Sequence, residues 1–415
     1  MKSTVKLFAV VLLVLCLAAP VFATGQKQAA GSVTMTMGSW RHEDVAQVSA
    51  MLAAYGKTAP GVGIQFRPTN APEYNATLRL QLDGGNGPDL MYARSYATGE
   101  ELFRAGHFAD CSDIAELKES FTAESLAPWQ TADGKTFAVP FAAVSHAIYY
   151  NKDIFKKEGL SVPGTWEDFL KLCAALQAKG YTALANGIAD EWDILECLFL
   201  GIVPNFVGGS AERVKYESGE KKFNDAAFVA AWQALADLAK YLPVGYESVT
   251  YNDEQILFSS QQAAMLMDVS ATIKAYDGVA FDWGLFALPA PAGRKAVIMF
   301  HPDMAIAYNT KSAHPSEAKS FVRWLATKEG VAIAAQNMPV GFFPMINAPI
   351  QLADKHAKEF LDLNNGREVD VRFLWPKFME LYTPMNQAVI QVLAGRLTPR
   401  QAADQMENLA ANIRK

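Results

Sequence analysis

The first part of the chain alternates between short apolar runs and longer segments with helical periodicity. Residues 33–37, 62–66 and 89–93 are apolar or alternate apolar with polar positions, which is typical of strands. Residues 43–55 instead carry apolar side chains on one helical face: Val45, Val48, Met51, Leu52 and Tyr55. A second helix is expected before the third strand, so strands and helices alternate. This order predicts an α/β fold with a parallel, doubly wound sheet and right-handed crossovers.

Capping residues mark the starts of several predicted helices. Asn70 is placed to cap the second helix, and Glu73 stands at the position that completes a capping box. Thr165 precedes another helix, with Asp168 three residues later, and this helix is expected to end at Gly180. Each pair satisfies backbone donors that a helix start leaves free.

The middle and the tail of the chain follow the same rules. Two strands are expected in the middle, one ending near Pro140 and one over residues 147–150. Thr398 begins another capping signature, and the apolar stripe of the last helix is expected to continue through Met406 and Leu409. No tandem repeat or low-complexity segment is found along the sequence.

The N-terminus has the features of a secretory signal peptide. Two lysines in the first six residues precede an apolar run over residues 7–19 and small residues around Ala23. We expect residues 1–23 to be cleaved and residues 24–31 to form a flexible leader. A lipid anchor on Cys16 is the alternative, although the leucine before it is bulky for such a site.

Length and charge limit the class of protein further. A chain of 415 residues is long enough for two domains, each with its own core. Without the signal peptide it has 35 basic and 43 acidic residues, so its net charge of −8 gives no electrostatic footprint for nucleic acid. No other apolar run approaches ~20 residues. We therefore expect a soluble monomer that binds no nucleic acid.

The three cysteines beyond the signal peptide leave two interpretations open. Cys111, Cys173 and Cys197 lack the spacing of a metal site, and their number is odd. One disulfide is compatible with an oxidising compartment. Three buried, reduced cysteines are the other interpretation.

Motifs for catalysis, cofactors and metals are missing from the sequence. It contains no GxSxG, HExxH, GxxxxGK[ST] or GxGxxG in the required context. The run "HED" at residues 42–44 lacks a further His or Cys, and "DGGNGPD" lacks the alternating oxygen ligands of a calcium loop. We expect no cofactor, no metal and no enzymatic activity. A glycoside-acting enzyme stays open, because scattered carboxylates could form a pair in the fold.

Two loops are candidates for binding by their position. In doubly wound sheets, ligands bind beyond the carboxyl ends of the strands. The loop after the first strand carries Trp40, Arg41 and His42, and the loop after the third carries Arg94, Ser95 and Tyr96. An ordinary surface loop is the alternative for each of them, least so for Trp40, because an exposed indole is costly without a partner.

Aromatic residues near turns and strand ends indicate the kind of ligand. Sugars present flat C–H faces to aromatic rings and hydroxyl groups to polar side chains, so a sugar cleft mixes both types. We expect about half of the candidates to lie in the core. They are Trp40, Phe141, Trp192, Phe300, Phe342, Phe343, Trp375 and Tyr382.

One motif and six further ones, in the correct order, resemble those of a known family. "YYNKDIFKKEGLSVPGTWEDF" at residues 149–169 resembles the signature of extracellular solute-binding proteins of family 1, which serve sugar ABC transporters and include maltose-binding-like proteins. Similar motifs are "GNGPDLMYA", "DGKTFAVPF", "FSSQQAAMLMD", "DWGLFALPAPAG", "HPSEAKSFVRWLATKEG" and the closing "LAGRLTPRQAADQMENLAANI". They cover nearly the whole mature chain.

The resemblance implies a periplasmic-binding-protein fold of class II. Two α/β lobes, each a doubly wound sheet flanked by helices, would enclose a ligand cleft. Lobe 1 would comprise residues 32–143 and 288–338, and lobe 2 residues 144–287 and 339–415. The chain would cross between lobes near Ala143, Leu288 and Pro339, where Pro and small residues suit hinges.

The resemblance also implies site residues. The first crevice loop falls on residues 38–43, including Glu43, and the segment after the hinge includes His146. Lobe 2 would contribute an aromatic at Trp192 and another at Trp375 or Tyr382. Trp192 and Trp375 are expected to stack on the ligand, and Asp268 and Glu43 to accept its hydroxyl hydrogen bonds.

Two departures from the family pattern bear on the ligand. Asp268 begins "DVSA" where relatives often have a Gly and a Trp, and Phe300-His301 stands where a Gly pair is usual. These changes indicate a small or more polar sugar.

The resemblance implies a role in import. The protein would bind a mono- or short oligosaccharide in the periplasm or at the cell surface and pass it to transmembrane permease subunits of an ABC importer. A polyol, a glycerol-phosphate or a polyamine stays open as the ligand. A polyamine pocket would be rich in carboxylates, and a phosphate pocket in Arg and helix N-termini.

Overall fold

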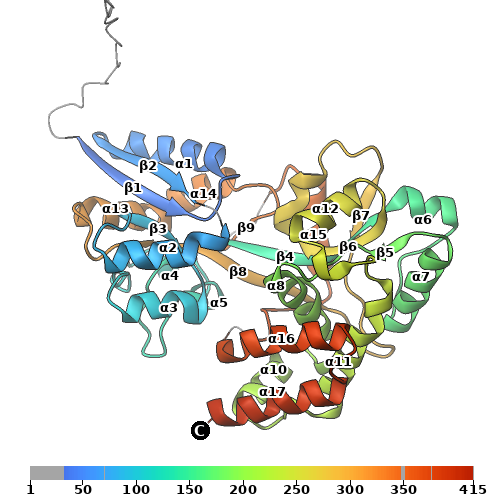
Figure 1. The fold of residues 1–415 in the computed structure, drawn as a ribbon. Coiled ribbons are helices and arrows are strands. Elements are labelled where there is room, and N and C mark those ends of the chain that lie inside the picture. The colour runs from blue at the N-terminus through green and yellow to red at the C-terminus, as the bar shows by residue number, and fades with distance from the viewer. Residues whose placement is uncertain (1–31, 70, 347–350, 375, 415) are drawn as a thin grey trace, which may run out of the picture.

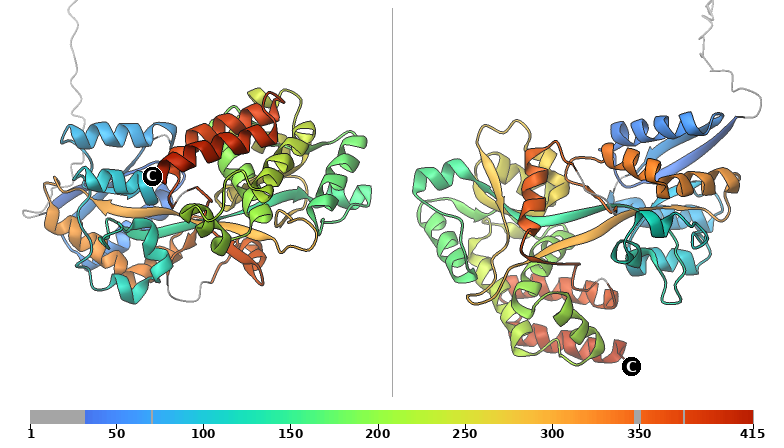
Figure 2. Two further views of the ribbon diagram at one scale, coloured as in Figure 1. Left: turned by 90° about the horizontal axis from the view of Figure 1, so that it is seen from below. Right: turned by 180° about the vertical axis from the view of Figure 1, so that it is seen from behind.

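The computed structural model describes residues 32–414 except for 70, 347–350 and 375. Some predictions therefore lie outside the described residues: the signal peptide, its Cys16 alternative, the leader, the Asn70 cap and Trp375. Figure 1 shows two α/β lobes side by side, joined by long strands, and Figure 2 shows the same separation from two further directions.

The first lobe begins with the predicted alternation of strands and helices. Its sheet has the order β2-β1-β3, and both pairings of β1 are parallel, which confirms the expected arrangement. Helices cover the sheet on both sides (Figure 1). The elements before the long strands are β1 (Val33–Ser39), α1 (Val45–Thr58), β2 (Val62–Pro68), α2 (Ala71–Asp83), β3 (Leu90–Ala93), α3 (Tyr96–Arg104), α4 (Leu117–Ser120), α5 (Ala123–Leu126) and η1 (Ala127–Trp129).

Two long strands connect the lobes. β4 (Val139–Asn151) and β8 (Val297–Tyr308) pair with each other in antiparallel fashion, and β8 also pairs with β3. The prediction of two separate strands near Pro140 and over residues 147–150 is wrong, since β4 is continuous. At the expected strand end near Pro140, the structure has a pair of register shifts between Pro140 and Ala143, which bend the strand without ending it.

The second lobe surrounds the other ends of these strands. β6 (Ala263–Val269) and β7 (Trp283–Phe286) pair with β4, and β5 (Thr182–Leu184) extends the sheet beside β6. Its helices before β8 are α6 (Lys152–Glu158), α7 (Trp166–Ala178), α8 (Glu191–Asp193), the π-helical η2 (Ile194–Phe199), α9 (Leu200–Val207), α10 (Ser210–Ser218), α11 (Ala226–Leu238), η3 (Ala239–Tyr241), η4 (Tyr246–Ser248), α12 (Tyr251–Ser259) and η5 (Ser270–Tyr276).

The remaining elements return to both lobes. Helices α13 (Pro315–Ala326) and α14 (Lys328–Gln336) lie on the first lobe, and the short β9 (Phe343–Pro344) pairs with β4. The tail then covers the second lobe (Figure 1) with α15 (Lys355–Asn364), β10 (Glu368–Asp370), η6 (Met379–Leu381), α16 (Tyr382–Leu393) and α17 (Pro399–Ile413).

Predicted caps hold two of these helices. The Oγ1 of Thr165 accepts a hydrogen bond from the backbone N–H of Asp168, and Thr398 forms a capping box with Gln401. The stripe of α17 includes Met406 but not Leu409, whose surface is 39% exposed. Ala402, Met406 and Ala410 lie four residues apart on the buried side, so Leu409 turns away from it.

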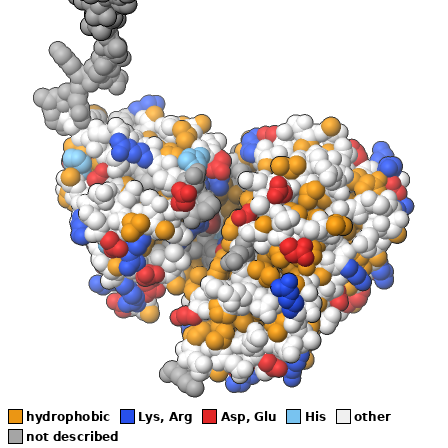
Figure 3. Space-filling model, in the orientation of Figure 1, with side chains coloured by type: hydrophobic (Ala, Val, Ile, Leu, Met, Phe, Trp, Pro, Cys, Tyr) orange, Lys and Arg blue, Asp and Glu red, His pale blue; other side chains and the backbone are white. Residues whose placement is uncertain are grey.

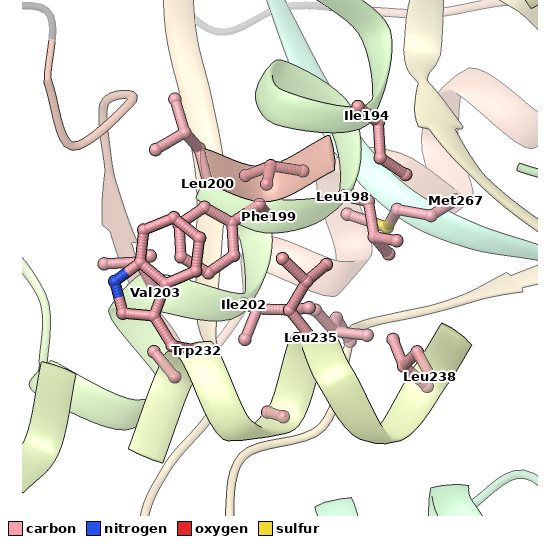
Figure 4. Packing of buried hydrophobic residues seen from close by; sticks show 14 of the residues in the cluster. Ile194, Leu198, Phe199, Leu200, Ile202, Val203, Trp232, Leu235, Leu238 and Met267 are labelled. Atoms are coloured by element: carbon pink, nitrogen blue, oxygen red, sulfur yellow. The ribbon is translucent and has the colours of Figure 1, made fainter. Parts of the chain in front are cut away.

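Each lobe has its own hydrophobic core. One contains residues from Met35 to Val144 and from Met304 to Met345, and the other residues from Ile148 to Met299 and from Phe373 to Ala410. Figure 4 shows η2 and α9 packed on α11, with Phe199 against Trp232 at 4.2 Å between ring centroids.

The core residues bear on where the chain crosses between lobes. Leu288 and Met299 both pack in the second core, whereas Met304 packs in the first. We infer that the second crossing lies within β8, after Met299, rather than near Leu288. The other boundaries of the lobes stay predictions.

The third predicted crossing is tied closely to the end of β6. Gly341 has a φ of +89°, and an added Cβ there would overlap the backbone of Ser270. The Oγ of Ser270 donates to the carbonyl oxygen of Gly341 at 2.5 Å and accepts from the N–H of Ser145 at 3.0 Å. Of the two interpretations of the cysteines, buried and reduced is confirmed for the three that the structure describes, Cys111, Cys173 and Cys197.

Candidate functional site

A groove separates the two lobes on the face shown in Figure 3. The carboxyl ends of β1 and β3 lead into the loops that begin at Trp40 and Arg94, at the edge where doubly wound sheets bind ligands. The middle of β4 and β8 joins the lobes beneath them (Figure 1).

Trp40 and Arg94 form the centre of the first wall. The guanidinium carbon of Arg94 lies 3.6 Å from the centroid of the Trp40 ring, and Arg94 Nη1 is 4.0 Å from Asp303 Oδ1. The indole is only 5% exposed, since Tyr74 and Tyr92 cover its other sides. Arg94 keeps 29% of its side chain exposed, so it presents donors above a fixed aromatic base.

The other predicted residues of this loop divide into fixed and exposed ones. The Nε of Arg41 donates to the buried carboxylate of Asp44 at 2.9 Å, and its guanidinium lies over the ring of Phe342 at 4.4 Å. His42 and Glu43 are exposed, and Glu43 is 4.0 Å from Arg41. Arg41 therefore holds the shape of the loop, whereas Glu43 is accessible.

The predicted residues on or beside the connecting strands are buried, except Phe300, which is partly buried. The Oγ of Ser95 donates to the carbonyl oxygen of Pro302 at 3.1 Å, which ties the third-strand loop to β8. His146 Nε2 and His301 Nδ1 are 3.2 Å apart. Phe300 is partly buried and lies against Phe343.

The second wall contains a cluster that the sequence did not indicate. Glu196 in η2 accepts a hydrogen bond from the hydroxyl of Tyr382 at 2.5 Å and forms an ion pair with Arg372. The Glu196 side chain is 14% exposed and that of Arg372 6%. Tyr382 was predicted from the resemblance, but Glu196 and Arg372 belong to no motif and come together only in the fold.

The two walls are close enough to interact electrostatically. Burial lowers the pKa of the Arg94 guanidinium, while Asp303 and then Glu196 oppose this shift and Arg372 adds to it. Arg94 therefore lies within electrostatic range of a carboxylate and a guanidinium of the second lobe. The buried His146 and His301 contribute no charge near neutral pH, since burial lowers the pKa of both imidazoles well below the usual value.

Trp192 and Asp268 occupy different depths of the second lobe. Trp192 is 36% exposed, and its ring lies 4.8 Å from that of Tyr251. Asp268 has no exposed surface, and its Oδ1 accepts from the hydroxyl of Tyr251 and from the N–H of Val269. The direct ligand contact expected of Asp268 stays a prediction that this burial does not favour.

The aromatic candidates divide as expected into core and accessible residues. Trp40, Phe141, Phe342 and Phe343 are at most 5% exposed, whereas Trp192, Phe300 and Tyr382 keep more surface. Two other surface hollows, one lined by Val45 and Phe66 and one by Leu352 and Leu361, contain none of the candidate residues.

A comparison of the sequence with family models decides the family. Residues 39–332 match the model described as bacterial extracellular solute-binding protein. The chain belongs to this family.

Relatives and solved structures agree with this assignment. The multiple sugar-binding protein of Streptococcus mutans is 26% identical over 310 residues, which are 71% of each chain. The mannitol-binding protein of Pseudomonas aeruginosa is 24% identical over 426 residues, covering 93% of each. The fold is similar to that of a chitin oligosaccharide binding protein, with a TM-score of 0.78 and 22% identity over 93% of this chain and all of that one.

No group of three or more His, Cys, Asp or Glu residues is arranged to hold a metal ion in the part of the chain that the structure describes. No single described helix is long and apolar enough to cross a membrane. One pair, Ile194–Val207 and Ser210–Ser218, passes by length and composition but is bent by 93°.

Proposed function

We propose that the protein captures a sugar, a mono- or short oligosaccharide, in the groove between its lobes. It then delivers the sugar unchanged to the membrane permease of an ABC importer. Support comes from the family and from relatives whose names state sugar or sugar-alcohol binding.

One arrangement carries the proposal for this chain. Arg94, held between Trp40 and Asp303, lies within electrostatic range of Glu196 and Arg372 of the second lobe, and Glu196 also binds the hydroxyl of Tyr382. Sugar hydroxyls both donate and accept hydrogen bonds, so a wall with paired guanidinium and carboxylate groups can satisfy them. Trp192 and Tyr382 supply ring surface for the C–H faces of the sugar.

The balance of charge supports a neutral ligand. Arg94 and Arg372 are matched by Asp303 and Glu196. A polyamine would need excess carboxylates, and a glycerol-phosphate would need excess donors and positive charge. A polyol is the second candidate, because the mannitol-binding relative matches 93% of this chain.

A thermal-shift screen tests the proposal. Residues 24–415 are heated with monosaccharides, disaccharides, short oligosaccharides and mannitol. A ligand at about a hundredfold excess over its Kd should add about 2.7 kcal/mol of stability. The variant Glu196→Gln should lose most of the shift, whereas Glu220→Gln, an exposed carboxylate on the same lobe, should keep it. Absence of any shift across the screen would contradict the proposal.

Export completes the proposed function. Residues 1–23 act as a cleaved signal peptide, and the mature chain works in the periplasm or at the cell surface. Residues 24–415 expressed alone should be a soluble monomer. Recovery only in membrane fractions would instead favour a lipid anchor at Cys16.

A further inference from the structure

The helical segment over residues 191–199 has one side toward the groove and one side toward the core. Trp192 and Glu196, four residues apart, are the accessible pair, with 36% and 14% exposure. Asp193 and Cys197, also four apart, are at most 2% exposed. In Figure 1, α8 lies on the side of the second lobe that is turned toward the first lobe. Its central turn is a π-helix, a form often found at functional sites.

Tyr251 holds the start of this segment from below. Its ring lies 4.8 Å from the Trp192 ring, and its hydroxyl donates to Asp268 Oδ1 at 3.1 Å. Its backbone N–H donates to Asp190 Oδ2 at 2.8 Å, two residues before Trp192. The capping box of Thr250 and Asp253 fixes Tyr251 as the first residue of α12. One side chain therefore connects the exposed indole to the buried end of β6.

Three buried carboxyl groups surround the inner end of this connection. Asp193, Glu254 and Asp268 come from α8, α12 and β6, and each is at most 2% exposed. Asn186 donates to Glu254 Oε2 at 3.2 Å, but no Lys or Arg forms an ion pair with the three in the described part of the chain. The other titratable groups that interact with the cluster are Tyr149, Glu196, Cys197, Tyr251 and Tyr276, and Arg372 acts on Cys197.

Burial makes ionisation of this cluster costly near neutral pH. Burial raises the pKa of Asp268 to about 7 and, together with the charge of Asp268, raises the pKa of Asp193 to about 8. Burial and then Asp193 raise the pKa of Glu254 well above its usual value. Ionised Asp268 would accept a stronger, charge-assisted hydrogen bond from Tyr251, and ionised Asp193 would add a like charge beside it.

We propose that Tyr251 is a positioning residue that holds Trp192 at the groove through its hydrogen bond to Asp268. The position of Trp192 therefore changes when the buried carboxyl cluster ionises. The inference rests on the proposed function in one respect, that Trp192 contacts the sugar. Tyr251 itself touches no ligand.

Acrylamide quenching of Trp192 between pH 5.5 and 9.5 tests the proposal without any ligand. The contribution of Trp192 is the difference between the mature protein and its Trp192→Phe variant. It should change with a midpoint between pH 7 and 8. In Tyr251→Phe, which keeps the ring but loses the hydroxyl, and in Asp268→Asn, this pH-dependent change should be lost.

Tyr276→Phe is the matched control. Its hydroxyl also interacts with Asp268, but its ring packs on Tyr149, Phe258 and Trp283 rather than on Trp192. Its Trp192 signal should keep the pH-dependent change, with the midpoint moved to higher pH because ionised Asp268 loses a favourable interaction with the Tyr276 hydroxyl. A Trp192 signal that is constant over the whole range, or one that still titrates in Tyr251→Phe with its circular dichroism intact, would overturn the proposal.

A second measurement separates this inference from the proposed function. With a sugar found in the thermal-shift screen, Tyr251→Phe should bind more weakly than Tyr276→Phe at pH 7.5. Equal affinities would overturn the link between Tyr251 and binding. Failure of every sugar to bind would contradict the proposed function, whereas the quenching result would still decide whether Tyr251 positions Trp192.

Discussion

The imidazole rings of His146 and His301 are hydrogen-bonded to each other, with Nε2 of His146 3.2 Å from Nδ1 of His301. They belong to β4 and β8, the two strands that connect the lobes, and both are at most 2% exposed. One ring must donate and the other accept, so both can remain neutral in this geometry. Protonation of both would place two donors face to face at the junction of the lobes.

This pair predicts a loss of stability in acid. Burial lowers the pKa of His146 and of His301 well below the usual value, and Arg372 adds to both shifts. In the unfolded chain the two imidazoles bind protons below their usual pKa of about 6.5, whereas in the folded state they stay neutral at that pH. Stability from the pair is therefore present above that pH and is lost as the pH falls further.

Urea unfolding at pH 7.5 and pH 5.0 checks this prediction. Between the two values the contribution of the imidazole pair to the free energy of unfolding should fall by about 1.4 kcal/mol for each unit of pKa difference that is crossed, and this fall is separate from the opposite change caused by the buried carboxyl groups. His301→Gln should reduce the fall, and His42→Gln, which alters an exposed imidazole, should not. An equal fall in both variants would count against the neutral pair.

The buried carboxyl groups predict the opposite trend at higher pH. The folded pKa of Asp193, about 8, lies above its unfolded value of 3.8. The folded state keeps the proton that the unfolded chain releases, so stability is full below the unfolded pKa and is lost as the pH rises through the folded one. Between pH 5.0 and pH 9.0 the wild type should therefore lose more free energy of unfolding than Asp193→Asn, which has no carboxyl group to ionise at this position. Unfolding at pH 5.0 and 9.0, with Glu220→Gln as the exposed control, measures the difference.

Trp192 is the accessible aromatic whose loss should weaken binding most clearly. Trp192→Ala should cost about 1–3 kcal/mol of binding free energy, as expected for an aromatic contact that becomes desolvated. Tyr181→Ala removes a partly exposed ring that packs beside Lys157 and Glu158, away from α8, and should leave the Kd unchanged. Isothermal titration with a sugar from the screen compares the two. Similar affinities for both variants would remove Trp192 from the groove contacts.

Local signals in the sequence were sufficient for much of the fold. Thr165 and Thr398 cap their helices as predicted, because capping depends on residues within one turn. β4 was divided wrongly, since its Pro and small residues also suit a bulge in a continuous strand. The alternation of the first five elements was enough to predict parallel pairing around β1.

The site was less predictable than the fold. Their position at the carboxyl ends of strands was enough to select Trp40 and Arg94 as candidates. It did not predict that the guanidinium would cover the indole. Glu196 and Arg372 meet only when the tail packs on η2, and neither has a neighbour in the sequence that indicates an ion pair. Asp268 was chosen for its departure from a family pattern, which carries no information about its depth.

The central claim is that a sugar binds between the lobes and draws them together. A ligand can shift a conformational equilibrium only by its preference for one state, so binding and compaction must be linked. β4, β8 and the segment around Gly341 join the lobes, and a few backbone angles there can absorb a rotation without repacking either core.

Small-angle X-ray scattering of the mature protein, with and without a saturating sugar from the screen, tests this claim most directly. We predict that the radius of gyration decreases with the sugar and follows the same concentration dependence as binding measured by calorimetry. A radius of gyration that stays constant while the sugar binds would contradict lobe closure and favour a rigid pocket.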